Sequence, residues 1–133
     1  MRYLLDVNVL VAWGRVDHLD NERVEKWLVA LIKEGKAKVP TSTIPELGFV
    51  RVSIQRSRGR ITADQASEVL DGLVKSLGRL HGFLPDDQAA RIWPAWSQTA
   101  PRTTDAHLLA LAKAHGVELA TLDTGIPGAW LLP

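Results

Sequence analysis

The chain has 133 residues, of which 46% are hydrophobic and 23% charged. This length and balance are typical of one folded domain and exclude a disordered or fibrous protein. The formal net charge is only +1, and there is no cysteine, which excludes disulfides and thiolate metal sites. We therefore expect a single globular domain over residues 1–133.

The apolar stretches are interrupted by charge or proline within about ten residues, well short of the roughly 20 that span a bilayer. Arg2 precedes the first apolar run and Asp6 lies inside it, and no small-residue cleavage site follows, so we expect no secretory signal. The absence of cysteine is compatible with an oxidant-poor compartment. These features favour a cytoplasmic protein that does not enter a membrane.

The chain begins with a segment, residues 2–5, that is short and apolar enough for a buried strand. Asn8 is expected to cap a helix that follows at once, and Asp20 to cap a longer helix that ends at Gly35. The longer helix has apolar residues at helical spacing: Val24, Trp27, Leu28, Leu31 and Ile32.

A second short strand is expected at residues 37–39. The residues from Thr43 to Glu46 then have the form of a capping box, with Pro45 tolerated in the first turn, and they predict the start of another helix. The residues expected on its inward face are Leu47, Val50 and Ile54.

A further helix is predicted from Thr62, because Gln65 follows at the spacing of a capping box. The residues expected on its core face are Ala66, Val69, Leu70, Leu73, Val74 and Leu77. A third strand is expected at 79–84 and a short helix at 86–93.

Thr103 is expected to cap the last long helix, which ends near Gly116. Two more strands are expected, at 117–122 and 130–132. Strands that alternate with helices indicate a mainly parallel sheet covered on both faces, with ligands at the carboxyl ends of the strands.

Four acidic residues lie at the ends of these elements: Asp6, Glu46, Asp105 and Asp123. Mg²⁺ and Mn²⁺ prefer carboxylate oxygens, and a bound ion can activate water and orient a phosphodiester. Without these four acids, 16 basic residues face 11 acidic ones, which suits a polyanionic substrate held outside an acidic pocket. A mixed, solvated surface explains the same charge count.

Each of these acids also has a purely structural explanation. Glu46 could complete a capping box with Thr43, and Asp105 could favour the positive end of a helix. Asp123 could belong to an ordinary Asp-x-Gly turn, and Asp6 could be a buried carboxylate with satisfied hydrogen bonds. Their joint occurrence at strand and helix ends favours the site.

Four stretches in this order resemble the PIN domain, specifically the VapC-like toxin ribonucleases of bacterial toxin–antitoxin pairs. They are "LLDVNVLVAW", "TSTIPELGFVRV", "TTDAHLLALAKAHG" and "LATLDTGI", and the resemblance covers essentially the whole chain. It implies a three-layer α/β/α sandwich with a mainly parallel central sheet. It also implies a Mg²⁺- or Mn²⁺-dependent endoribonuclease that hydrolyses RNA phosphodiester bonds, a cognate VapB-like antitoxin and a homodimer.

The resemblance also implies roles for individual residues. The matches to the family's catalytic, metal-binding quartet are Asp6, Glu46, Asp105 and Asp123. Asn8 and Thr121 match polar positions that orient the first and last acids. Two departures are small: Leu122 stands where a basic residue often precedes the last aspartate, and no acid follows in the "DTGIPG" loop.

Several arginines are candidates for contact with RNA. Arg51, about one helical turn beyond Glu46, is expected near the pocket mouth. Arg56, Arg58 and Arg60 form a basic loop that could track an RNA backbone. A solvated helix face and a solvated turn are the alternatives.

The four histidines show no metal-ligand spacing, and we assign them no catalytic role. Trp93 and Trp96 are expected in the core or in a dimer contact rather than stacked on bases.

Two other functions remain open from the sequence. One is a degenerate PIN domain that binds RNA or protein without cleavage. The other is a phosphatase with Asp6 as nucleophile, because an aspartate after the first strand of an α/β sheet also serves that chemistry. Asn8 disfavours the Asp-x-Asp form of such an enzyme.

Overall fold

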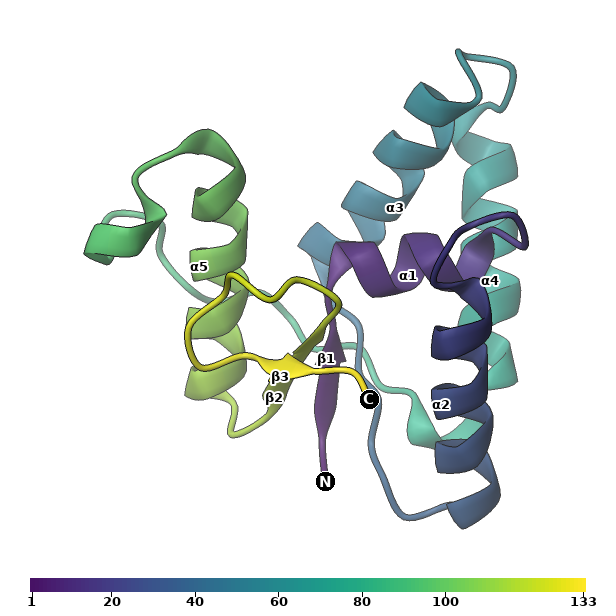
Figure 1. Cartoon of the computed structure of the whole chain (residues 1–133), viewed down its shortest axis with the longest axis horizontal. Helices are drawn as coiled ribbons and strands as arrows, with labels where there is room; N and C mark the ends of the chain where they lie inside the picture. The colour runs from purple at the N-terminus through teal and green to yellow at the C-terminus, as the bar shows by residue number, and fades with distance from the viewer.

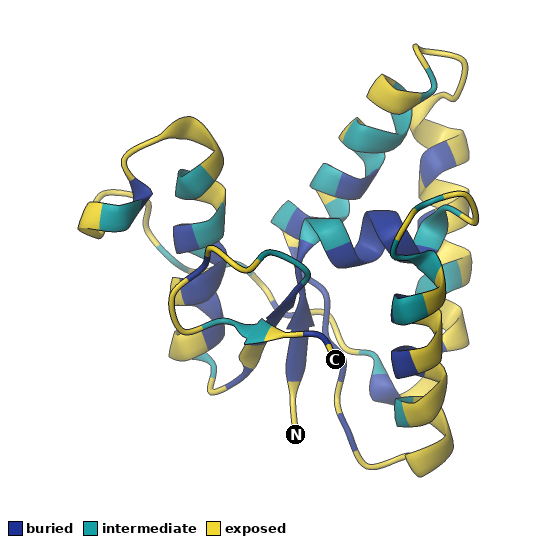
Figure 2. Cartoon of the chain, viewed as in Figure 1, coloured by how far each residue is buried: buried dark blue, intermediate teal, exposed yellow.

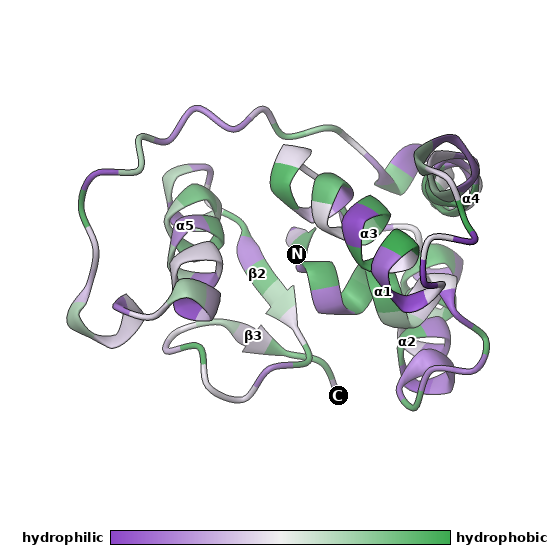
Figure 3. Ribbon diagram, turned by 90° about the horizontal axis from the view of Figure 1, so that it is seen from above, coloured by the Kyte–Doolittle hydropathy of each residue, from purple (hydrophilic) through white to green (hydrophobic).

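The computed structural model describes residues 1–133 and has a small sheet with α5 on one side and the other helices on the opposite side (Figures 1 and 3). The strands are β1 (Tyr3–Leu5), β2 (Glu118–Thr121) and β3 (Trp130–Leu131); the helices are α1 (Val7–Gly14), α2 (Asn21–Glu34), α3 (Thr43–Arg56), α4 (Ala63–Ser76) and α5 (Ala100–Ala114). No helix combines the length and the apolar character that crossing a membrane requires.

The sheet is parallel throughout, in the order β1-β2-β3. Beyond β1 the sheet continues irregularly: the Tyr3 N–H donates to the Lys38 carbonyl at 2.8 Å, and the Leu84 N–H donates to the Thr41 carbonyl at 2.8 Å. The prediction of a mainly parallel sheet is therefore confirmed. It brings the carboxyl ends of β1 and β2 side by side.

The outer segments of the sheet are less regular than expected. Residues 37–39 and 79–84 contribute isolated bridges instead of strands, and residues 86–93 form no helix. Proline explains part of this difference, because Pro40 and Pro85 have no N–H to donate to a ladder. The segment from 79 begins instead with a 3-10 turn, Gly78–Leu80.

Side chains of the strands alternate between two cores, which makes the three layers of the sandwich. Leu4 and Leu119 pack with Leu108 and Leu111 of α5, whereas Leu5 and the other inward-facing residues pack against α1 and α2. Both cores are buried along the strands, as the dark colour in Figure 2 shows. Alternation is what parallel strands need when helices cover both faces.

An aromatic cluster joins α2 to the sheet. Trp27 lies edge-on to Tyr3 with ring centroids 5.2 Å apart, and Trp130 lies 4.7 Å from Tyr3 and 5.3 Å from Trp27. Trp96 packs against the core beside α5, as expected, but Trp93 exposes 36% of its surface.

Three helix termini lie where the sequence predicts them. Thr62 and Gln65 form a complete capping box at the start of α4. Asp20 precedes α2, and Gly35 ends it in the left-handed conformation with φ of 72°, which glycine adopts without a steric cost. The sequence predicts these termini correctly because they depend only on residues close by in the chain.

Three predicted caps are wrong. Asp6, not Asn8, is the N-cap of α1. Ser42, not Thr43, precedes α3, and α5 begins at Ala100, so Thr103 lies inside it and Asp105 lies beyond the first turn.

The predicted inward face of α3 is only partly confirmed: Val50 packs against the core, but Leu47 does not. Leu47 is 54% exposed, and α3 buries Pro45 and Phe49 instead. On α4, Ala66 and Leu70 are buried as expected, but Val69 is exposed. The reason is tertiary: the burial of α3 and α4 is set by how they cross α1 rather than by hydrophobicity alone.

The crossing of α1 and α3 depends on Gly48. A Cβ on Gly48 would lie 2.7 Å from Cγ2 of Val7, closer than packed side chains tolerate. Val7 directly follows Asp6, so this contact sets how α3 lies against the residue that ends β1.

We predict that Gly48→Ala destabilises the protein by about 1–3 kcal/mol, because the added methyl group overpacks the α1–α3 contact. Gly72→Ala is the matched control: Gly72 is an exposed glycine in α4 with nothing near its Cβ position, and the change should stabilise by about 0.5–1 kcal/mol. Urea denaturation of the two variants measures both effects. Equal changes in the free energy of unfolding would contradict the role of Gly48.

Candidate active site

The carboxylate of Asp6 is buried where β1 passes into α1. Asp6 is 3% exposed. Its Oδ1 accepts the Val7 N–H at 2.7 Å, and its Oδ2 accepts the hydroxyl of Thr121 at 2.7 Å. Since Asp6 follows β1 and Thr121 ends β2, the hydrogen bond between them joins the ends of two neighbouring strands.

Asn8 and Thr121 extend this network to the last acid. The Asn8 amide nitrogen donates to Thr121 Oγ1 at 3.1 Å, and its amide oxygen accepts the Leu122 N–H at 3.1 Å. Thr121 Oγ1 also accepts the Asp123 N–H at 3.0 Å. Asn8 therefore connects α1 to the segment that carries Asp123.

Burial raises the pKa of Asp6 to about 6 from its usual 3.8. The hydrogen bonds from Thr121 and Val7 oppose this rise, and the charges of Asp105 and Asp123 add to it. The last two effects show that three aspartates from separate elements interact electrostatically.

Arg102 bridges two of these aspartates. Its Nη1 lies 3.1 Å from Asp105 Oδ2 and 3.0 Å from Asp123 Oδ2. Burial raises the pKa of Asp105, the hydrogen bond from Arg102 opposes that rise, and the charge of Asp123 adds to it. The guanidinium therefore offsets part of the repulsion among the carboxylates.

The backbone of Gly125 lies directly against Arg102, so closely that a Cβ would collide with the guanidinium. The Gly125 N–H donates to Asp123 Oδ1 at 2.7 Å, so the same turn holds Asp123. Arg102 was not among the site residues predicted from the sequence. The signal that could have found it is its i,i+3 spacing to Asp105 on a helix.

Glu46 bonds to a different group. Its Oε2 accepts the Thr41 hydroxyl at 2.6 Å, and Thr41 Oγ1 lies 2.8 Å from Nε2 of His81. Burial lowers the pKa of His81, with the charge of Glu46 opposing. Because the Thr41 hydrogen is given to Glu46, the hydrogen on Nε2 is donated to Thr41. Neither Thr41 nor His81 was expected at the site.

A cleft of about 900 Å³ opens beside Asp6 and Asp105, between α1, α3 and the start of α5. Arg51 and Arg56 lie in its wall, where an anionic substrate would meet them. Arg58 and Arg60 lie outside the cleft, in a shallow hollow that also includes Arg56.

Asp6, Asp105 and Asp123 offer carboxylate oxygens, the donors that a hard cation prefers. As the side chains stand, no three acids or histidines converge closely enough to hold a metal ion. Two contacts account for this spacing: Arg102 lies between Asp105 and Asp123, and Glu46 is turned to Thr41.

This chain is an α/β/α protein whose aspartates lie at the carboxyl edge of a parallel sheet, which is where proteins of this class bind their ligands. A family model described as "PIN domain" matches residues 3–128. The chain therefore belongs to the PIN domain family.

Its curated relatives are VapC proteins of Mycobacterium tuberculosis. The chain is 33% identical over 130 residues to "Ribonuclease VapC39" (95% of this chain, 91% of the relative). It is 36% identical over 141 residues to "Ribonuclease VapC44" (97% and 94%). It is 37% identical over 130 residues to "Ribonuclease VapC38" (92% and 86%).

A crystal structure of VapBC2 from Rickettsia felis, bound to a DNA fragment from its promoter, has a chain with a similar fold. The TM-score is 0.63 at 16% identity, over 98% of this chain and 97% of that chain. The predicted PIN-like α/β fold is thus confirmed.

We predict that Asp6 makes the protein less stable as the pH rises from about 4 to about 6. The folded-state pKa is about 6 and the usual value is 3.8, so the folded chain holds the proton more tightly. The resulting stabilisation is complete below the lower value and is lost by the upper one.

Asp6→Asn should remove this part of the pH dependence, which is on the order of 2–3 kcal/mol. Urea denaturation at a series of pH values in EDTA measures the difference between the variant and the parent chain. Parallel pH profiles would contradict the burial of an ionisable Asp6.

Proposed function

We propose that the chain is an endoribonuclease, dependent on Mg²⁺ or Mn²⁺, that hydrolyses RNA phosphodiester bonds and acts as the toxin of a toxin–antitoxin pair. The observation that carries the proposal is the juxtaposition of Asp6, Asp105 and Asp123 beside a cleft with arginines in its wall. The ribonuclease names of the VapC relatives support the same reaction.

Asp6, Asp105 and Asp123 would hold the cation, and Glu46 would join them as the fourth acid by turning away from Thr41. When bound, the cation supplies Lewis acidity to the phosphodiester and lowers the pKa of water. Release of Arg102 from Asp105 and Asp123 would free the oxygens that such an ion needs.

The chain's own residues orient the acids and the substrate. The Thr121 hydroxyl and the Val7 N–H each donate to one oxygen of Asp6. These two hydrogen bonds fix the orientation of the carboxylate. Asn8 holds the segment of Asp123 through the Leu122 N–H. Arg51, in the cleft wall, is placed to contact a phosphate of the RNA.

The two rival functions fit these contacts less well. A phosphatase needs Asp6 as an exposed nucleophile, yet this carboxylate is buried and both its oxygens accept hydrogen bonds. A degenerate PIN domain would be expected to lack some of the acids, whereas the chain keeps all four. Capture of a phosphorylated Asp6 would support the phosphatase.

We also propose an antitoxin partner, a homodimer and a cytoplasmic location. The structural neighbour is itself a VapBC complex, which supports the antitoxin. The antitoxin would bind over the cleft and block the access of RNA to the aspartates.

We predict that Asp6→Asn and Asp105→Asn each lower RNA cleavage by more than about 100-fold, a larger loss than follows from changes outside a metal's ligands. Glu46→Gln should lower it as well, because the variant cannot supply a charged fourth ligand. The measurement is cleavage of unstructured and structured RNAs by purified protein with Mn²⁺ or with EDTA. Circular dichroism establishes that each variant is folded. Cleavage by Asp6→Asn at the parent rate would overturn the mechanism.

We predict that Arg102→Ala tightens Mn²⁺ binding by about tenfold, or about 1.4 kcal/mol. The reason is that the guanidinium competes with the cation for the oxygens of Asp105 and Asp123. Isothermal titration calorimetry with Mn²⁺ alone measures the change.

Arg79→Ala is the matched control for Arg102→Ala. It removes an exposed arginine beside the amino end of the sheet, away from the aspartates, and should leave Mn²⁺ affinity unchanged. Weaker Mn²⁺ binding by Arg102→Ala would instead mean that Arg102 positions the acids.

A further inference from the structure

Arg15 lies at the opposite end of α1 from Asp6. Asp6 is the N-cap of this eight-residue helix and Arg15 is its C-cap, so the two are separated by roughly 13 Å along the helix axis. Nη1 of Arg15 is buried and is the one buried side-chain nitrogen or oxygen in the protein without a hydrogen-bond partner. The side chain as a whole is 29% exposed, so this N–H without an acceptor belongs to an arginine that an anion can still reach.

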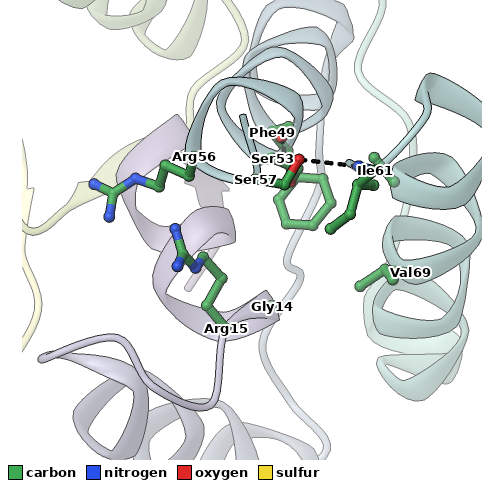
Figure 4. Close-up of a pocket in the computed structure, with 9 residues that line it drawn as sticks. Gly14, Arg15, Phe49, Ser53, Arg56, Ser57, Ile61 and Val69 are labelled. Carbon is green, nitrogen blue, oxygen red and sulfur yellow. Dashed lines mark hydrogen bonds between the residues drawn. The ribbon is translucent and has the colours of Figure 1, made fainter. Parts of the chain in front are cut away.

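The guanidinium of Arg15 lies at a hollow of about 150 Å³ between the end of α1, α3 and α4. Figure 4 shows that the side chains of Arg15 and Arg56 reach the same side of this hollow, from α1 and α3 respectively. The opposite side is lined by apolar residues, among them Phe49 and Val69. Two cations therefore share one edge of a partly apolar recess.

Neither arginine has a strong partner within the protein. Arg56 takes part in no ion pair. Arg15 meets only Asp17, at 3.5 Å, and the Asp17 side chain is 78% exposed. An ion pair that long and that exposed contributes little and is easily exchanged for another anion.

The hydroxyl groups in the hollow do not supply the missing acceptor. Ser53 Oγ donates to the Phe49 carbonyl at 2.7 Å, and Ser57 Oγ donates to the Ile54 carbonyl at 2.9 Å. Ser57 Oγ also accepts the Ile61 N–H at 3.0 Å. Both hydroxyl hydrogens are thus already donated within the protein, and neither serine oxygen accepts a hydrogen bond from Arg15. The Arg15 N–H that lacks an acceptor suits an anion.

Arg56 connects this hollow to the acidic cleft, because its side chain lines both. Arg51 lies along the same wall, nearer to Asp6 and Asp105. A chain of phosphates that starts at the aspartates and follows α1 would pass Arg51 and then reach Arg56 and Arg15.

We propose that Arg15 and Arg56 form a phosphate-binding subsite that holds the RNA backbone at a distance from the bond to be cut. This inference rests on the proposed function, since it takes the same RNA as ligand. The planar guanidinium forks suit the oxygens of a phosphodiester. The contact is to the backbone, so it positions the RNA without reading its bases.

The test is binding of a short fluorescein-labelled single-stranded RNA, measured by fluorescence anisotropy in EDTA so that cleavage does not intervene. Arg15→Gln should weaken binding about fivefold at 0.1 M salt, and should lower the slope of log affinity against log salt by about 0.7, the value for one phosphate contact on a single strand. Arg56→Gln should do the same. Arg15→Lys should retain most of the slope, because it keeps the charge.

Arg79→Gln is the control, since it removes one exposed positive charge at the far end of the sheet. Thermal melting of each variant establishes that it is folded at the temperature of the measurement. If Arg15→Gln matches Arg79→Gln in affinity and in salt slope, the subsite is overturned.

Cleavage with Mn²⁺, assayed on the parent chain, separates this inference from the proposed function. RNA binding that depends on Arg15 in a chain that cuts no RNA would overturn the nuclease proposal and keep the subsite. Cleavage by the parent chain together with unchanged binding by Arg15→Gln would keep the nuclease and overturn the subsite.

Discussion

The hydrogen bond between Asp6 and Thr121 is the contact on which the site depends. It joins the carboxyl ends of β1 and β2 at the point where both strands stop, and it holds a carboxylate that is 3% exposed. Burial alone would drive that group toward its neutral form. The donors Thr121 and Val7 keep the pKa near 6, so the acid stays available as an anion at neutral pH.

Charge balance is the second constraint. Asp6, Asp105 and Asp123 repel one another, and Arg102 offsets this repulsion by bonding to two of them. Under the proposed function, a divalent cation would compete with Arg102 for these oxygens. Arg51 and Arg56 place positive charge in the wall of the adjoining cleft.

Sequence patterns predicted the features that rest on neighbours along the chain. The strand before Asp6, the termini of α2 and the capping box of α4 are confirmed, as is the parallel sheet. The prediction that Leu47 faces inward was wrong, because the packing of α3 against Val7 through Gly48 outweighs the apolar pattern. Pro40 and Pro85 interrupt the outer strands because proline has no N–H to donate to a ladder. This reason is local, although the predicted strands did not take it into account.

By itself the sequence determined which acids are present and that Asp6 and Asp123 follow strands whose carboxyl ends lie together in a parallel sheet. Only the tertiary structure decided which groups pair: Asp6 with Thr121, Arg102 with Asp105 and Asp123, and Glu46 with Thr41. Thr121 lies 115 residues from Asp6 and Asp123 lies 21 residues from Arg102, whereas Arg102 and Asp105 are neighbours on one helix face. Side-chain direction and local burial, which spacing along a sequence does not specify, choose between them.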